Sequence, residues 1–162
     1  SLFQCIKRCG RQSRDDLMTN ATALNFGFPG AKVGETAAWL VLVRQKQPTF
    51  GSLVLVCKEE AKAFSDISAA AFADLQVPVT AIEGLLRKAV GYDRINYLML
   101  MMVDPDVHFH VIPRYEGARA YEGQDFADAG WPGPPALAQA VDLGADGAAK
   151  LARSLQRDWP QA

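Results

Sequence analysis

The stretch VHFHVIPR, residues 107–114, decides how this chain is interpreted, because it holds both histidines of the sequence. Successive side chains on a β-strand point to opposite faces, so His108 and His110 lie side by side on one face. The apolar residues at the alternate positions then face a hydrophobic core. Two imidazoles at this spacing can supply a nucleophile, transfer a proton or bind a metal ion. If the protein is an enzyme, we expect its chemistry here.

The residues before this stretch predict a hairpin followed by a helix. Apolar and β-branched runs at 36–43 and 51–57, joined by a polar turn, predict two antiparallel strands. Ser68 has the side chain of a helix N-cap, and apolar residues recur after it at helical period. Pro78 is expected to kink this helix or split it in two, and Gly91 to end it.

A second hairpin and a final helix complete the predicted fold. A run rich in leucine and methionine at 95–103 predicts a strand that turns at Asp104-Pro105 into a strand over 107–115. The composition of 116–135 predicts a long surface loop, and 145–158 predicts a helix. The fold class is therefore α+β: an antiparallel sheet with a helix packed on one face, plus a peripheral C-terminal helix. We expect one domain over 1–162, with its core at about 36–115 and a C-terminal extension over 116–162.

The N-terminal part of the chain gives weaker signals. Residues 15–18 favour a short helix, and NFGFPG at 25–30 predicts a loop. The aromatic side chains of this loop could cap a pocket or cover a sheet edge, and we favour the sheet edge. The three cysteines are an odd number, and the spacing of Cys5 and Cys9 does not match the common zinc half-site. We expect reduced, inert cysteines, Cys57 included.

The composition of the chain limits the classes of molecule that we expect it to bind. The chain is 49% hydrophobic with a formal net charge of −1, and acidic and basic residues are mixed along it. A nucleic acid polymer is not an expected partner, because no basic patch is present. No apolar run reaches the roughly eighteen residues of a membrane span, and no signal-peptide pattern is found. We therefore expect a cytoplasmic protein with no membrane partner.

The segment HFHVIPR, residues 108–114, resembles the end of the motif of the histidine triad (HIT) superfamily, in which three histidines alternate along a strand. The passage over 48–56, the helix and the following strand agree with that family in kind and order. The resemblance covers about 36–115. It implies a HIT-like fold, a homodimer and a nucleotide or dinucleotide substrate, with no tightly bound cofactor and no metal.

The resemblance also implies a reaction. HIT proteins are hydrolases and transferases that act at a nucleoside α-phosphate, on substrates such as dinucleoside polyphosphates or nucleoside phosphoramidates. His108 matches the middle histidine, the nucleophile that forms a nucleotidyl-histidine intermediate, and a neutral imidazole suits this role near neutral pH. His110 matches the last histidine, and a cationic His110 would stabilise charge on the leaving phosphate. Asp106 stands at the first triad position and completes the predicted catalytic set.

Four residues form the predicted nucleotide-binding set. Arg44 stands where many HIT proteins carry a ribose-binding asparagine, and its guanidinium offers a fork of donors for phosphate. Leu42 shares its strand face, Ser52 follows the matched glycine, and Arg114 ends the motif. The short segment 103–105 lacks the phosphate donors that usually precede the triad.

The departure at Asp106 leaves two alternatives open. With the short preceding loop, it favours a nucleotide-binding module that has lost its chemistry. Alternatively, Asp106, His108 and His110 could form a face of two histidines and one carboxylate, which suits iron, zinc or manganese in a metal-dependent enzyme.

Overall fold

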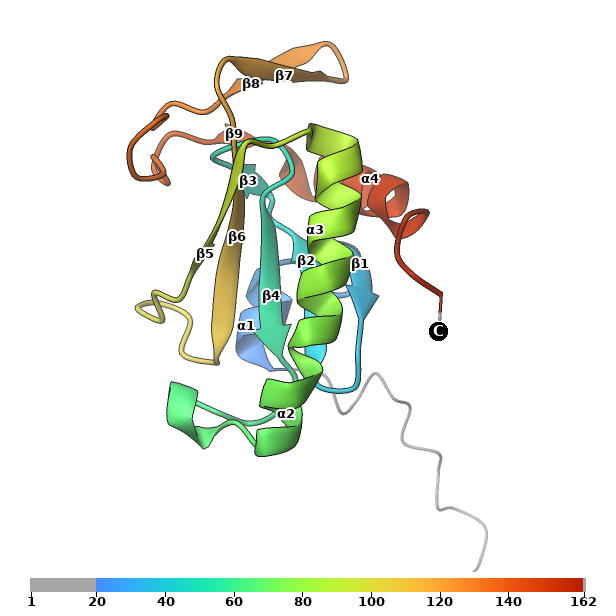
Figure 1. Cartoon of the computed structure of the whole chain (residues 1–162), viewed down its shortest axis with the longest axis vertical. Helices are drawn as coiled ribbons and strands as arrows, with labels where there is room; N and C mark the ends of the chain where they lie inside the picture. The colour runs from blue at the N-terminus through green and yellow to red at the C-terminus, as the bar shows by residue number, and fades with distance from the viewer. Residues whose placement is uncertain (1–19, 162) are drawn as a thin grey trace, which may run out of the picture.

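The computed structural model describes residues 20–161, and a five-stranded antiparallel sheet forms its centre. The strands, in spatial order, are β1 (Lys32–Glu35), β2 (Trp39–Val43), β4 (Leu53–Cys57), β6 (His108–Arg114) and β5 (Arg94–Leu98). Helix α3 (Gln76–Val90) covers one face of the sheet, and the short helix α1 (Ala21–Asn25) lies behind the other face (Figure 1). The predicted α+β class, with an antiparallel sheet and a helix on one face, is confirmed.

The predicted helix is split in two. Ser68 accepts a hydrogen bond from the Ala71 amide and so caps α2 (Ala69–Asp74). Helix α3 follows directly, with Pro78 in its first turn, where a missing N–H costs no internal hydrogen bond. It ends at Gly91, which has a left-handed φ of 62° that glycine adopts without strain.

Three predicted boundaries are wrong. The first predicted strand begins at Trp39, because the residues before it form the turn from β1. Strand β5 ends at Leu98, and the leucine and methionine run after it leaves the sheet as a loop. The predicted surface loop 116–135 contains a hairpin of β7 (Ala118–Tyr121) and β8 (Gln124–Ala127).

The β7–β8 hairpin was hard to predict because of its turn residues. Its two central residues, Glu122 and Gly123, both have positive φ, of 51° and 73°. Such turns usually carry asparagine or aspartate at the first of these positions, and glutamate gives no such signal. A second small sheet pairs β3 (Lys46–Gln47) with β9 (Val141–Asp142).

The core lies on both sides of the two central strands. All residues of β2 and β4 are buried, which fits a sheet covered on each face. From α3, Ile82, Leu85 and Leu86 pack into this core. The predicted C-terminal helix is α4 (Gly144–Gln156), which contacts β1 and β2 and buries Leu151 and Leu155.

One helical segment bears on the membrane prediction. Ala69–Val90, which joins α2 and α3, is long and apolar enough to cross a membrane by length and composition, with a mean hydropathy of 1.3. This qualifies the expectation that no apolar stretch has that length. Ile82, Leu85 and Leu86 of this segment pack against the sheet, and 33% of its apolar window is buried.

Candidate active site

The two histidines lie on the face of β6 that is opposite α3. His108 pairs with Val56 and His110 with Val54 of β4, and His110 also pairs with Leu98 of β5. Their ring centroids are 5.0 Å apart, so the alternation of the strand places them on one face as predicted. Their exposed fractions are only 2% and 7%, so the imidazoles lie in a largely desolvated environment.

The orientation of His108 is fixed by a backbone hydrogen bond. Its Nδ1 lies 2.6 Å from the carbonyl oxygen of Asp106. A carbonyl oxygen only accepts, so Nδ1 carries the proton and Nε2 of a neutral imidazole keeps its lone pair. The ring therefore presents Nε2 as a nucleophile or a base.

His110 is held differently. Its Nδ1 is buried and has no hydrogen-bond partner among residues 20–161. Burial lowers the pKa of His110 to about 4, helped by the positive charge of Arg44 and by His108, while Asp104 opposes the shift. His110 is therefore neutral at pH 7 in the ligand-free protein, and the cationic His110 expected beside a leaving phosphate stays a prediction for the ligand-bound state.

Arg44 follows β2 and is half-buried near His110. Its Nη1 donates to the carbonyl of Lys46 at 3.2 Å, and its buried Nε has no partner within the described part of the chain. Buried donors are normally satisfied, so an unpartnered guanidinium N–H, whose positive charge also acts on His110, suits an anionic ligand. The structure thus brings the predicted residues His108 and His110 together and places Arg44 close enough for its charge to act on His110.

Asp106 does not extend this row of side chains. It precedes β6, and its carboxylate accepts hydrogen bonds from Thr22, at 2.9 Å from the hydroxyl, and from Lys62. Burial alone would raise the pKa of Asp106, but these donors outweigh it and hold the pKa below its usual value. Asp106 serves His108 through its backbone carbonyl.

This arrangement counts against the metal alternative. Between residues 20 and 161, no group of three histidine, cysteine or acidic side chains is placed to hold a metal ion. The carboxylate of Asp106 is directed to Thr22 and Lys62 instead of to a position shared with His108 and His110.

The sequence reasoning missed Phe26, which follows α1. Its ring centroid lies 5.8 Å from that of His108 and 5.7 Å from that of His110. Of the two roles that the sequence left open for the aromatics of 25–30, the favoured one, covering a sheet edge, is wrong for Phe26, which lies on the histidine rings. Phe26 covers the histidine pair, and no local pattern could reveal this contact, because it joins segments about eighty residues apart.

Two of the other predicted binding residues, Ser52 and Arg114, are engaged in contacts away from the histidines. Ser52 is buried in a turn, where its hydroxyl donates to the carbonyl of Thr49 at 2.8 Å. Arg114 is 4% exposed and forms an ion pair with Asp128, with 2.7 Å between Nε and Oδ2. Leu42 is fully buried beside Val54, and its role in nucleotide binding stays a prediction.

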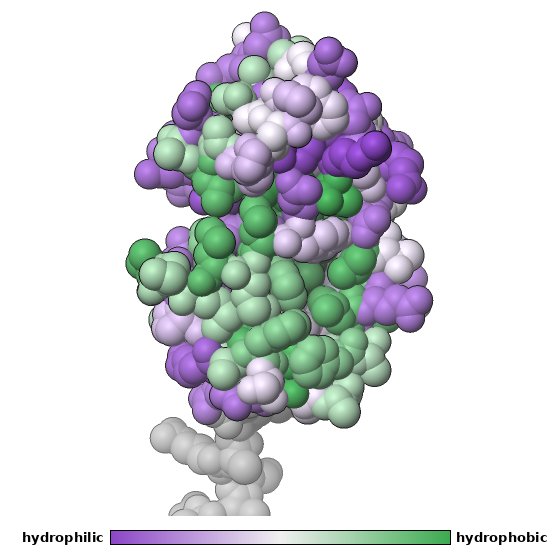
Figure 2. Space-filling view, turned by 60° about the vertical axis from the view of Figure 1, so that its left-hand side comes forward, coloured by the Kyte–Doolittle hydropathy of each residue, from purple (hydrophilic) through white to green (hydrophobic). Residues whose placement is uncertain are grey.

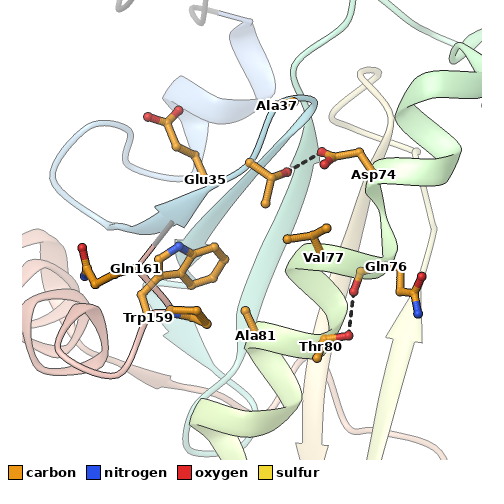
Figure 3. A pocket seen from close by; sticks show the side chains of 11 residues that line it. Glu35, Ala37, Asp74, Gln76, Val77, Thr80, Ala81, Trp159 and Gln161 are labelled. Atoms are coloured by element: carbon orange, nitrogen blue, oxygen red, sulfur yellow. Dashed lines mark hydrogen bonds between the residues drawn. The ribbon is translucent and has the colours of Figure 1, made fainter.

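A separate hollow of about 760 Å³ lies on the α3 side of the sheet (Figure 3). Val77, Ala81 and Trp159 give it an apolar wall. Its acidic groups are already engaged: Asp74 accepts from Thr36 at 2.6 Å, and Glu35 pairs with Lys58 at 2.8 Å. The hollow presents no pair of free reactive groups like the one on β6.

We compared the chain with known protein families, curated proteins and solved structures. No family model and no curated protein matches the chain. A solved histidine triad protein from Bradyrhizobium japonicum is similar, with a TM-score of 0.66 and 21% identity over 88% of this chain and 97% of that one. One from Sinorhizobium meliloti has a TM-score of 0.66 and 20% identity over 86% and 95%.

More distant similarities point the same way. The diadenosine triphosphate hydrolase of Plasmodium falciparum has a TM-score of 0.58 and 13% identity over 82% of this chain and 80% of that one. A histidine triad nucleotide-binding protein from Sulfolobus tokodaii has a TM-score of 0.56 and 15% identity over 85% and 90%. The chain therefore has the fold of the histidine triad proteins.

Proposed function

We propose that this protein belongs to the histidine triad superfamily and is a nucleotide hydrolase or transferase that acts at a nucleoside α-phosphate through His108. The observation that carries the proposal is the hydrogen bond from His108 Nδ1 to the Asp106 carbonyl, which leaves Nε2 as the free nucleophilic nitrogen. Similar folds support it, because they include a protein named as a diadenosine triphosphate hydrolase and one named as nucleotide-binding.

The proposed reaction has two steps. Nε2 of His108 attacks the α-phosphorus, a phosphorus–nitrogen bond forms, and the bond to the leaving group breaks with its electron pair going to that group. Water or another acceptor then attacks the phosphorus, releases the nucleoside phosphate and frees His108. A phosphate between His110 and Arg44 would raise the pKa of His110, so that a protonated imidazole stabilises the leaving group.

Access to His108 requires a movement of Phe26. With Phe26 against both rings and His108 only 2% exposed, a phosphate cannot reach Nε2 in this arrangement. Gly27, with a φ of 90°, follows Phe26 and is a natural place for the backbone to turn. We expect the nucleotide to displace the Phe26 ring as it enters.

An assay of AMP release tests the proposal. Diadenosine polyphosphates and adenosine phosphoramidate are offered to wild type and to His108→Asn, whose amide keeps a donor near the position of Nδ1. We expect the wild type to release AMP and the variant to lose at least about a thousandfold in kcat/KM, the scale of a removed nucleophile. A melting curve checks that the variant is folded, and Arg157→Gln at an exposed site serves as the control.

A binding module without chemistry is the second candidate. Asp106 at the first triad position and the neutral state of His110 at pH 7 favour it. It predicts that AMP raises the melting temperature of wild type while no substrate of the panel gives a product. Product formation that depends on His108 would contradict it.

We also propose a homodimer formed through an apolar face. The exposed large hydrophobic side chains include Phe64, Phe72, Leu100, Met102 and Val103. Phe64 packs on Phe72 and on Phe109 of β6, with ring centroids 5.4 and 5.9 Å apart. Figure 2 shows hydrophobic residues gathered in one broad area of the molecular surface. The neighbouring strand β5 is an edge strand, so a second copy could cover the face and extend the sheet.

Sedimentation of single variants tests the dimer. Phe72→Glu places a charge on the proposed interface and should shift the protein to a monomer. Val77→Glu is the matched control, because Val77 is 57% exposed on α3, in the wall of the separate hollow. A wild type that sediments as a monomer at all concentrations tested would contradict the proposal.

A further inference from the structure

A hollow of about 380 Å³ lies at the far end of the same sheet face as the histidines. Arg94 and Asn96 of β5 and the loop 131–134 line it. Asn96 pairs with Ile112 and Arg94 with Arg114, two and four residues beyond His110 on β6. At the rise of a strand, Asn96 and Arg94 therefore lie about 7 and 14 Å from His110 along the sheet. We call this the β5 hollow.

Buried contacts hold the walls of the β5 hollow in place. Arg114 donates to Asp128, to the carbonyl of Gly133 at 2.8 Å and to Oδ1 of Asn96 at 2.9 Å. Asp128 balances the charge of Arg114, so Arg114 is a structural cation here. The loop and β5 are thus fixed relative to each other without a ligand.

The groups left free in the β5 hollow are donors and one aromatic ring. Because Oδ1 of Asn96 accepts from Arg114, its amide N–H groups are available, and they make no hydrogen bond within residues 20–161. Arg94 is exposed, donates only to its neighbour's carbonyl at 2.9 Å and forms no ion pair with any described residue. Trp131 is half-exposed. This set suits an anion that carries a planar ring.

The order of His108 and His110 along β6 indicates which part of a substrate would reach the β5 hollow. His108 is the nucleophile of the proposed function, and His110 lies next along the strand, where the leaving group departs. Beyond His110, the half-exposed Leu98 and Asn96 lead along β5 to Arg94. A leaving group long enough to follow this path ends in the β5 hollow.

We propose that the β5 hollow binds the leaving nucleotide of a dinucleoside polyphosphate, with Arg94 on its phosphate and Trp131 stacked on its base. This rests on the proposed function and narrows its substrate class. Dinucleoside polyphosphates then use both ends of the sheet face, whereas phosphoramidates with a small leaving group use only the histidine end.

The test compares two substrates that donate the same AMP. Diadenosine triphosphate has ADP as its leaving group, and adenosine phosphoramidate has ammonia. Arg94→Gln and Trp131→Ala should each lower kcat/KM for diadenosine triphosphate by about tenfold or more, which corresponds to one lost charge-assisted or stacking contact. The phosphoramidate should change by less than about twofold, and Arg157→Gln should change neither.

The outcomes separate this inference from the proposed function. Equal losses for both substrates, or no loss for either, would overturn the β5 hollow as a leaving-group site while AMP release stands. If wild type releases no AMP, the proposed function fails, and ADP binding then tests the hollow alone. If ADP quenches the tryptophan emission of wild type, and the quenching vanishes in Trp131→Phe and weakens in Arg94→Gln, the β5 hollow is still a nucleotide-binding site. If ADP causes no quenching, the inference is overturned.

Discussion

The two imidazoles on β6 differ although they stand two residues apart. His108 donates from Nδ1 to a backbone carbonyl, which fixes its ring and leaves Nε2 free. His110 has an unpartnered Nδ1 and a pKa of about 4, because burial and Arg44 disfavour its charged form. One ring is set to attack before any ligand arrives, and the other becomes cationic only when an anion offsets Arg44 and the desolvation.

Proton uptake on nucleotide binding tests this difference. A phosphate beside His110 raises its pKa, so binding of AMP near pH 6 should take up a proton at His110. Calorimetric titrations in buffers of different ionisation enthalpy should give a larger uptake for wild type than for His110→Gln. The variant also corrects for the titration of the phosphate itself, and equal uptake in both proteins would contradict the assignment.

Acid stability gives a second test of His110. Its pKa falls from 6.5 to about 4 on folding, so the unfolded chain binds this proton first as the pH drops. The stability that His110 contributes is complete above pH 6.5 and is lost as the pH falls through its folded pKa, about 3 kcal/mol in total. Urea unfolding across this range should show a smaller loss for His110→Gln, and matching losses would contradict the low pKa.

At the scale of elements, helix α1 positions Phe26 over the histidine pair, and the carboxylate of Asp106 holds this helix in place. Thr22 of α1 is bonded to the Asp106 carboxylate, and Asn25 donates to Asp104 at 2.9 Å. Asp106→Asn removes the charge that holds Lys62 and should cost about 1 kcal/mol of stability. We expect faster hydrogen exchange over 21–28 and faster modification of the histidines by diethyl pyrocarbonate. Asp158→Asn, which breaks an exposed pair with Lys88, should change neither.

The loop that walls the β5 hollow depends on a buried ion pair. Asp128 is the counter-charge of the buried Arg114, so Asp128→Asn leaves a buried cation without full compensation. We expect a loss of about 3 kcal/mol in the free energy of unfolding, measured in urea. A loss of less than about 0.5 kcal/mol would mean that the pair adds no more than an exposed one.

The sequence predicted those elements whose signals are local. The alternation in 107–114 placed both histidines on one face, and Ser68 and Gly91 marked helix ends by capping chemistry. It did not predict that the run after Leu98 leaves the sheet, because leucine and methionine suit a strand and a loop over an apolar surface equally. Phe26 and Asp128 could not be assigned, since their partners lie far away in the chain.

At the scale of the whole molecule, the two faces of the central sheet differ: one packs into the core, and the other carries the candidate site. The face under α3 is core, while the opposite face carries Arg44, the histidine pair and, at its far end, the β5 hollow. The antiparallel register sets these groups in a row without any bound ligand. Under the proposed function, a substrate that occupied the whole row would have a nucleotide at each end.

The central claim is that His108 forms a covalent bond to the nucleotide. Wild type is mixed with diadenosine triphosphate for a single turnover, quenched in base, digested and analysed by mass spectrometry, with His108→Asn treated in parallel. The account predicts an acid-labile adenylyl group on the peptide that carries His108, and none in the variant. AMP release by the variant at the wild-type rate, or an adenylyl group on another residue, would contradict it.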